Sequence, residues 1–441
     1  MTAIAGITPG NSTVVKAMLE KMGRRGAYTH VFQIGPVTLG EIWPEGKKES
    51  PDPTCVMHSP DPGHFARASW TAGKLVLERD RVGVTPLYYS NLPDGAVAFA
   101  SEVKALIGLS TDINELRPGA RWSNGKVDPP LPWVAGKALN EPAEIISEEL
   151  RRRLEKAVRV QLNGQQAGSW LSGGLDSSVI AALLRPLVNK LVTVAAGFEG
   201  SPDLKYAKRM AVHLGAEHHE RVATFDELLK LLPEVIYNLE SFDALLVRSS
   251  LTHFLAAQTA ADYMGDVFSG EGGDELFAGY EYLKTIKAAA LPGELIDITN
   301  RLHNTALQRV DRSAGAFALT AHVPFLDAQV VDYALRIPAG LKINNGVEKW
   351  ILRQAAVDML PEDVLNRPKA KFWEGSGVGA QLAAYADANI GDTEFVRGRL
   401  LPNGWMLHSK EEMLYYRIFH DCFGDLDNLD WMGRTKGAPV V

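Results

Sequence analysis

The sequence predicts two domains: packed antiparallel sheets over residues 1–135, then an α/β domain with a parallel sheet over residues 140–441. The first part contains short β-like runs with little helix, which is typical of packed antiparallel sheets. From Glu144 onward, apolar runs alternate with helical patterns, as in a parallel sheet wound with helices. Residues 124–142 contain four prolines and end in a polar run, which favours a domain boundary there.

The elements of the first domain are short. One helical pattern covers residues 14–22, and β-like runs are expected at residues 3–7, 31–34, 37–42, 65–70, 75–79 and 97–100. Residues 45–64 are rich in proline and aspartate, so we expect a surface loop between the third and fourth runs.

The second domain begins with apolar residues at helical spacing from Ile146 to Val158. Strands are expected at residues 166–171, 191–198 and 266–269, and helices at 177–184, 204–214 and from Glu275 onward. Ligands of such sheets bind beyond the carboxyl ends of the strands. We therefore expect three loops to meet there, at residues 172–178, 200–203 and 269–275.

The first loop reads Ser-Gly-Gly-Leu-Asp-Ser-Ser over residues 172–178. Its adjacent glycines allow a close backbone approach, and the helix that follows begins with amides suited to phosphate. The Walker A lysine that contacts the β- and γ-phosphates is absent, so a different triphosphate chemistry is indicated. A carboxylate at an anion site, here Asp176, is explained if it holds Mg²⁺ on pyrophosphate.

The third loop, residues 269–275, is again glycine-rich and acidic. In this arrangement Asp274 can face Asp176 across a shared Mg²⁺, and Glu271 lies near the reaction centre. A helical pattern covers residues 306–327, ending in a tight turn, and another helix is expected over 347–359. Lys349 lies early in that helix, where it is either a surface cation or points into the cleft. The adjacent His218 and His219 are interpreted as the end of a strand, because neighbouring strand residues face opposite sides.

Composition excludes several classes of function. The net charge of −7 disfavours a nucleic-acid partner, whose phosphates require a basic face. The only cysteines, Cys55 and Cys422, lack the spacing of a disulfide framework or a zinc site. With neither a signal-peptide pattern nor a long apolar span, we expect a soluble cytoplasmic protein without a membrane partner.

Several motifs together resemble the synthetase domain of glutamine-dependent asparagine synthetases. They are SGGLDSS (172–178), SPDLKYAKRMAVHLGAEHHE (201–220), SGEGGDELFAGY (269–280), HVPFLD (322–327), VEKWILR (347–353) and SKEEMLYYRIF (409–419). Upstream, MTAIAGI, GRRGAY, RDRVGVTPLYYS, FASEVKAL and RPGARW resemble the N-terminal glutaminase domain of that family. The resemblance implies a truncated N-terminal nucleophile hydrolase-like sandwich, followed by an adenine nucleotide α-hydrolase-like domain.

The resemblance also implies an ATP- and Mg²⁺-dependent ligase that forms an acyl-adenylate and releases pyrophosphate. Glu271 matches the position that deprotonates the attacking amine, and Lys349 matches the lysine that stabilises charge at the adenylate and the tetrahedral intermediate. Asp176 and Asp274 are the implied Mg²⁺ ligands. The implied nucleotide-binding residues are Leu171, Ser172, Gly173, Gly174, Asp176, Ser177, Arg248 and Gly270.

Two departures from the family pattern concern the glutaminase. The family uses an N-terminal cysteine exposed once Met1 is removed, but position 2 is Thr2. The chain also passes from Ile42 to Phe65 where the family carries a much longer glutamine-binding stretch. We therefore expect no glutaminase activity and a domain retained as structure.

The residues expected around the substrate also depart from the family pattern. Leu245 and Leu246 stand where asparagine synthetases tend to carry threonine, and Thr320 stands where many relatives have glutamate. An unpaired buried polar group costs about 1–3 kcal/mol, so a more apolar pocket favours a longer amino-acid-like substrate over aspartate. The β-lactam and carbapenam synthetases also carry an inactive glutaminase domain, yet they have a tyrosine in place of Glu271.

Our hypothesis is an AMP-forming amide ligase that joins a small carboxylate to an amine, without using glutamine as the nitrogen source. A specialised, β-lactam-synthetase-like biosynthetic enzyme is favoured, and an ammonia-dependent asparagine synthetase is the alternative. A catalytically silent scaffold is disfavoured by the intact Asp176, Glu271, Asp274 and Lys349. A tRNA-modifying ATP pyrophosphatase is disfavoured by the acidic balance. Whether the chain forms a homodimer is left open.

Overall fold

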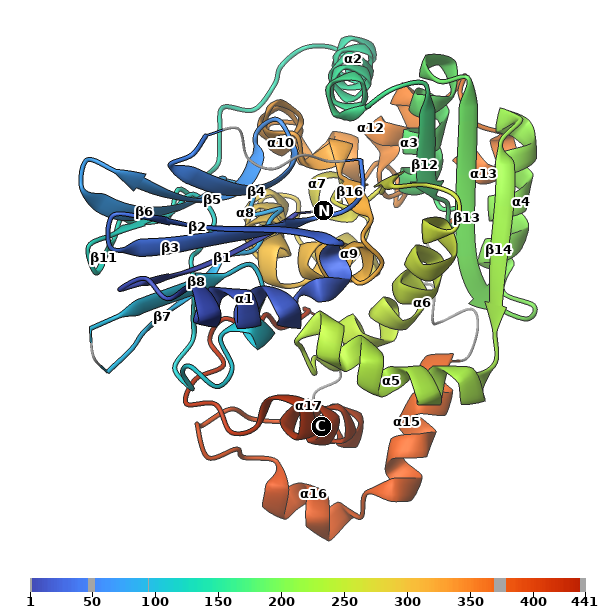
Figure 1. Cartoon of the computed structure of the whole chain (residues 1–441). Helices are drawn as coiled ribbons and strands as arrows, with labels where there is room; N and C mark the ends of the chain where they lie inside the picture. The colour runs from blue at the N-terminus through green and yellow to red at the C-terminus, as the bar shows by residue number, and fades with distance from the viewer. Residues whose placement is uncertain (1, 47–51, 94, 369–377, 437–441) are drawn as a thin grey trace.

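The structure, a computed structural model, describes residues 2–46, 52–93, 95–368 and 378–436, which form two antiparallel sheets and one parallel sheet (Figure 1). The predicted fold class is therefore confirmed. The first sheet has the order β2–β3–β1–β8–β7–β9. Its strands are β1 (Ala3–Thr8), β2 (Tyr28–Ile34), β3 (Val37–Trp43), β7 (Tyr88–Asn91), β8 (Val97–Ala100) and β9 (Asn114–Glu115).

The second antiparallel sheet has the order β11–β10–β6–β5–β4. Its strands are β4 (Cys55–Asp61), β5 (His64–Thr71), β6 (Lys74–Arg79), β10 (Arg121–Ser123) and β11 (Lys126–Val127). Apolar side chains from both sheets, such as Ile4 and Leu39 on one and Val56 and Leu77 on the other, share a fully buried cluster. The two sheets thus form the expected sandwich, and the helix α1 (Ser12–Lys21) packs against β1 and β3.

The prediction of a surface loop over residues 45–64 is wrong in its second half. Strand β4 pairs with β5 and buries Val56, His58 and Asp61. Proline and aspartate indicate loops because they are rarely found in β-strands. In β4, however, the buried polar side chains of His58 and Asp61 have partners in the other domain. Residues 47–51 lie outside the described part of the chain.

The parallel sheet has the order β14–β13–β12–β15–β16 and follows α2 (Ala143–Gln161). Its strands are β12 (Gln166–Trp170), β13 (Lys190–Phe198), β14 (Glu217–Ala223), β15 (Asp266–Phe268) and β16 (Thr320–His322). All but the first residue of β13 are buried, because α4 (Pro202–Leu214) and α6 (Ala244–Ala261) pack against it. The crossover helix α3 (Leu175–Leu184) follows β12.

The remaining helices differ from the sequence prediction in three places. The helix expected from Glu275 is the short α7 (Gly273–Phe277), and α12 (Trp350–Ala355) begins after Lys349. The pattern over 306–327 divides into α9 (Ala306–Gly315) and β16, whose three residues are too few for a period to be recognised. In the described part of the chain, the other α-helices are α5 (Phe225–Leu239), α8 (Leu291–Asn300), α10 (Ala328–Leu335), α11 (Ala339–Lys342), α13 (Glu362–Leu365), α15 (Val378–Asn389), α16 (Asp392–Gly398) and α17 (Lys410–Phe423).

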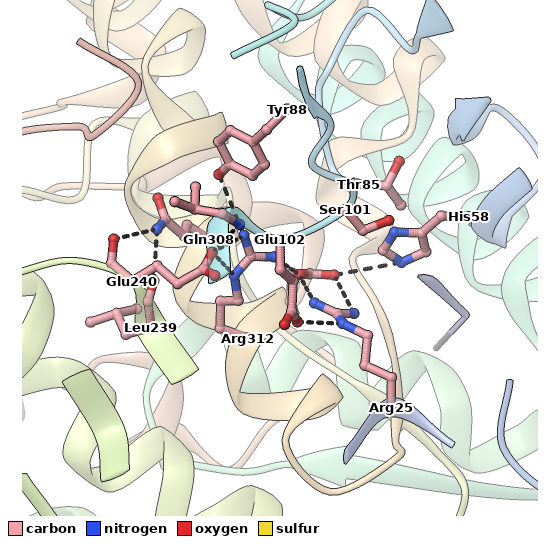
Figure 2. A network of polar contacts seen from close by, with 12 residues as sticks. Arg25, His58, Thr85, Tyr88, Ser101, Glu102, Leu239, Glu240, Gln308 and Arg312 are labelled. Atoms are coloured by element: carbon pink, nitrogen blue, oxygen red, sulfur yellow. Dashed lines mark hydrogen bonds and ion pairs between the residues drawn. The ribbon is translucent and has the colours of Figure 1, made fainter. Parts of the chain in front are cut away.

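Buried ion pairs connect the antiparallel sheets to the helices of the second half (Figure 2). Arg25 lies 2.5 Å from Glu102 in its own half and 2.5 Å from Asp311 in the other. Glu240, which lies 2.6 Å from Arg312 in the second half, accepts a hydrogen bond from the backbone N–H of Lys104 at 2.7 Å. All five ion-paired side chains are at most 6% exposed, so the two halves share a charged core rather than a solvated seam. The boundary between residues 135 and 140 stays a prediction.

Within the described ranges, no helix combines the length and apolarity that a membrane crossing requires. The cytoplasmic location stays a prediction.

Candidate functional site

The loop over residues 171–174 connects β12 to α3. Gly173 has a φ of +69°, and a Cβ there would collide with Tyr206 of α4. The backbone N–H of Ser172 donates to Oγ of Ser177 at 3.2 Å, which closes the loop onto the first turn of α3. The first N–H groups of a helix have no intrahelical acceptor, so this end of α3 can bind an anion.

The loop after β15 packs directly on the first loop, and its glycines make this contact feasible. A Cβ on Gly270 would lie 2.6 Å from the backbone nitrogen of Ser177. A Cβ on Gly273 would lie 2.5 Å from Oδ1 of Asp176. Side chains at either glycine would separate the two loops, and with them Asp176 and Asp274.

Lys349 joins these two loops. Its Nζ forms an ion pair with Asp176 and lies 2.5 Å from Oδ1 of Asp274, while its side chain is 2% exposed. The backbone of Lys349 is left-handed, with a φ of +54°, immediately before α12. Such a conformation costs a non-glycine residue about 1–3 kcal/mol and is typical of functional sites. Because its side chain is buried, the alternative that Lys349 is a surface cation is wrong. The side chain also requires a glycine at position 279, where a Cβ would collide with its Cε.

Glu271 has a partner that the sequence did not indicate. Arg309 of α9 places Nη2 2.5 Å from Oε2 of Glu271 and donates from Nη1 to Oγ of Ser249 at 2.7 Å. The side chains of Glu271 and Arg309 are 11% and 15% exposed. The pair brings together α9, α6 and the loop after β15, which are distant in sequence.

Glu275 is a second carboxylate beside Glu271 that sequence reasoning missed. It accepts a hydrogen bond from the hydroxyl of Tyr280. Burial, together with the nearby carboxylates of Glu271 and Asp274, raises the pKa of Glu275 to about 8. Its carboxyl group is thus mostly protonated near neutral pH and can donate as well as accept a proton.

These side chains line one cavity of about 500 Å³. That volume is typical of a small-molecule site. Leu171, Ser172, Gly174, Asp176, Ser177, Leu245, Leu246, Gly270, Glu271, Asp274, Glu275, Arg309 and Lys349 are all among the lining residues.

Three residues named from the sequence are not among the lining residues. Gly173 supports its loop from behind, against Tyr206. Arg248 is paired with Glu411, whose Oε1 lies 2.7 Å from its Nε, so the structure does not bring Arg248 together with the loops. Thr320 is buried at the start of β16, outside the cavity, so its side chain does not make the cavity more apolar.

The donor set suits Mg²⁺. Asp176 and Asp274 follow two neighbouring parallel strands, β12 and β15, and their carboxylates converge on the single ammonium of Lys349. Mg²⁺ is commonly bound by one or two carboxylates plus substrate phosphates and waters, so two carboxylates beside an anion-binding helix end are sufficient. Among the described residues, no group of three or more histidine, cysteine, aspartate and glutamate side chains could hold a metal alone. His218 and His219 therefore do not belong to such a group.

A family model described as asparagine synthase matches residues 149–297 and 288–435, the region that contains every residue named above as lining this cavity. The chain belongs to the asparagine synthase family. A model of the glutamine amidotransferase domain matches residues 57–118, within the antiparallel sheets. The resemblance seen in the sequence motifs is thereby confirmed.

Relatives of this asparagine synthase family chain include a chicken (Gallus gallus) asparagine synthetase, named as glutamine-hydrolyzing. It is 36% identical over 345 residues, which are 68% of this chain and 61% of the relative. Asparagine synthetase B of Escherichia coli K12, also named as glutamine-hydrolyzing, is 34% identical over 388 residues, covering 82% of this chain and 70% of the relative. This chain therefore spans less than two thirds of the chicken protein's length.

Among solved structures, an NMN synthetase from Francisella tularensis matches with 14% identity and a TM-score of 0.30, over 66% of this chain and 98% of that one. A likeness this weak supports no inference about function.

Proposed function

We propose that this chain is an ATP- and Mg²⁺-dependent ligase that joins a carboxylate to an amine, without using glutamine as the nitrogen source. In the first step a carboxylate oxygen attacks the α-phosphate of ATP, and pyrophosphate leaves. In the second step the amine attacks the acyl carbon and AMP leaves, while the amine's proton passes to a base. The two steps balance as ATP, carboxylate and amine giving amide, AMP and pyrophosphate.

One observation carries the proposal: the ammonium of Lys349 lies between Asp176 and Asp274 in a cavity bordered by the first turn of α3. A buried cation beside an anion-binding helix end stabilises negative charge where it develops, at the α-phosphate and on the acyl oxygen. Bound Mg²⁺ would be held by Asp176 and Asp274 and would neutralise the leaving pyrophosphate.

We assign Glu271 as the group that takes the proton of the attacking amine. Its pairing with Arg309 fixes the carboxylate's position. A general base contributes when it lies within hydrogen-bond reach of the proton it removes. In this assignment Arg309 is a positioning residue, because it acts through Glu271.

Independence from glutamine is supported by Thr2, which occupies the position of the family's nucleophilic cysteine. Thr2 Oγ1 lies 3.3 Å from the backbone carbonyl of Met57, to which it donates a hydrogen bond. The amidotransferase match begins only at residue 57. The expected result is that ammonium or a substrate amine supports turnover whereas glutamine does not. Release of glutamate from glutamine as fast as AMP forms would contradict this part of the proposal.

The lining residues Leu245 and Leu246 favour a specialised biosynthetic enzyme over an ammonia-dependent asparagine synthetase. The two leucines offer no polar partner to a substrate charged at both ends. The alternative substrate remains aspartate.

The proposal is tested by exchange of radiolabelled pyrophosphate into ATP in the presence of candidate carboxylates. We expect carboxylate-dependent exchange in the wild-type protein. Asp176→Asn and Asp274→Asn are expected to lose it while retaining the wild-type melting temperature. A protein that binds ATP but never exchanges pyrophosphate would be a silent scaffold, and wild-type exchange in either variant would remove that residue from the metal site.

A further inference from the structure

The helix α6 forms one wall of the cavity. Leu245, Ser249, Thr252 and Ala256 all line it, and their spacing of four, three and four residues places them along one face of the helix. At a rise of about 1.5 Å per residue, this stripe is about 16 Å long. The cavity therefore has two ends, one at each end of the stripe.

The end near Ala256 belongs to the nucleotide loops. His253 of α6 packs edge-on against Trp170, with ring centroids 5.1 Å apart, and Trp170 is the last residue of β12. The loop that contains Ser172 directly follows Trp170. Ser249, which contacts Arg309 and through it Glu271, lies between this end and the other.

The end near Leu245 is built by a segment that the sequence did not connect with the site. Arg434, Thr435 and Lys436 line the cavity there, although they follow Leu245 by almost 190 residues. The backbone N–H of Thr435 donates to Oδ2 of Asp243 at 3.2 Å, and Asp243 is the N-cap of α6. This contact fixes residues 434–436 beside the start of the helix.

The wall at this end is cationic. Arg301, Arg434 and Lys436 line the cavity, whereas the acids that pair with them, Asp297, Glu294 and Glu412, do not. Lys436 lies 2.5 Å from Asp297, Arg301 lies 3.1 Å from the same carboxylate, and Arg434 lies 2.7 Å from Glu412.

The acids thus contact the cations without lining the cavity themselves. Each cation keeps further N–H groups that can donate to a ligand in the cavity. The acidic lining residue on the neighbouring segment, Glu281, is 75% exposed and pairs with Lys284 at 2.8 Å.

Apolar side chains separate the cationic wall from Glu271. Leu245 and Leu246 line the cavity within one helical turn of Ser249, and Ile298 and Ala306 are also among its lining residues. Ser249 and Leu245 are one helical turn apart, about 6 Å along α6. A ligand that reaches along α6 from the reaction centre to the cationic wall therefore passes Leu245 and Leu246.

We propose that Arg301, Arg434 and Lys436 bind a distal carboxylate of the substrate, which is a dicarboxylate with an apolar chain longer than that of aspartate. The inference rests on the proposed function, because it takes the reacting carboxylate to lie near Glu271 and Lys349. The distal group is recognised by charge-assisted hydrogen bonds, and the chain is recognised by the leucines.

The test compares linear dicarboxylates from succinate to suberate with monocarboxylates of the same length, such as octanoate beside suberate, in pyrophosphate exchange. Suberate is expected to be used at lower concentration than octanoate. Arg301→Gln and Lys436→Gln are each expected to raise the KM for suberate about tenfold or more and to leave that for octanoate within about twofold. The matched controls are Arg417→Gln and Lys410→Gln, whose side chains pair with Glu394 and Asp392 outside the cavity.

Binding is measured independently of turnover, as thermal stabilisation by suberate in the presence of a nonhydrolysable ATP analogue. Stabilisation that is lost in Lys436→Gln but kept in Lys410→Gln supports the inference. Equal use of suberate and octanoate, or an unchanged suberate KM in both lining variants, overturns it while the ligase proposal stands. Failure of the wild-type protein to bind the ATP analogue overturns the proposed function itself.

Discussion

Asp311 of α9 accepts two hydrogen bonds from Arg25, at 3.2 and 2.5 Å, and both side chains are 1% exposed. Two residues earlier on the same helix, Arg309 pairs with Glu271 in the cavity. The short helix α9 thus contacts Glu271, the candidate base, through one side chain and the N-terminal half of the chain through others. Figure 2 shows the second set of contacts, around Arg25 and Arg312. A substitution of Arg25 therefore removes a contact of α9, the helix that also carries Arg309.

Arg25→Met is expected to lower the free energy of unfolding by about 3–5 kcal/mol, because it leaves Glu102 and Asp311 buried without this cation. Its neighbour provides the control: Arg24 pairs with Glu234 at the surface, where the side chains are 51% and 39% exposed. Arg24→Met should cost no more than about 1 kcal/mol. Urea unfolding measures both variants, and equal losses would contradict the assignment.

The stability that His322 contributes should fall as the pH rises from about 6.5 to about 9. Burial by itself would lower the pKa of His322, but the carboxylates of Asp61 and Asp266 raise it to about 9. The protonated ring therefore stabilises the fold fully below pH 6.5, its ordinary pKa, and this contribution is lost by pH 9.

The size of the effect is on the order of 3 kcal/mol. His64, which also pairs with Asp61, has a raised pKa and adds in the same direction. The stability that His322→Gln loses relative to the wild-type protein should therefore shrink as the pH rises from about 6.5 to about 9, whereas His420→Gln, at an exposed pair with Asp425, should show no such trend. Chemical denaturation across this pH range is the measurement, and a wild-type profile in His322→Gln would rule out the assignment.

Glu271→Gln and Lys349→Met should separate the two proposed half-reactions. Glu271→Gln is expected to keep carboxylate-dependent pyrophosphate exchange and to lose amide formation about 10²–10⁴-fold, as for a general base. Lys349→Met should weaken both steps by about 10²–10³-fold, because negative charge develops in each. Quenched-flow detection of the acyl-adenylate distinguishes the variants. If Glu271→Gln loses adenylation as completely as Asp274→Asn, Glu271 belongs to the metal or nucleotide site.

Replacing both Leu245 and Leu246 with threonine should raise aspartate-dependent AMP formation relative to the native substrate. Each new hydroxyl can pair with a charged group that the leucines leave without a partner. Val247→Thr is the control, since Val247 is buried in the same helix but does not line the cavity. No change in the use of any acidic substrate by the double variant would place both leucines outside the substrate site.

The two loops could be predicted because each carries its signal within a few residues. Gly173, Gly174 and Asp176 directly follow a buried strand, and so do Gly270 and Asp274. Parallel strands bring their carboxyl ends to one edge, so convergence follows from topology alone.

Arg309 and the 434–436 segment could not be predicted in this way. Their positions depend on how α9 and the chain after α17 pack, and no local pattern encodes that packing. The direction of the Lys349 side chain could not be predicted either. A helical pattern over 347–359 gives no indication of the left-handed backbone that turns this residue toward Asp176 and Asp274.

The position of α9 has an evolutionary consequence. Selection that acts only on amide synthesis would still act on Arg25 and Glu102, because their charges are matched by Asp311 and Arg312 on the helix that holds Arg309. A gene that no longer needs glutamine hydrolysis could therefore discard the nucleophile and the glutamine-binding stretch. It could not discard the sheets themselves without depriving Asp311 and Arg312 of the buried counter-charges on Arg25 and Glu102. Decay of the ancestral reaction would then be confined to its reactive residues, while the residues facing α9 stay under constraint.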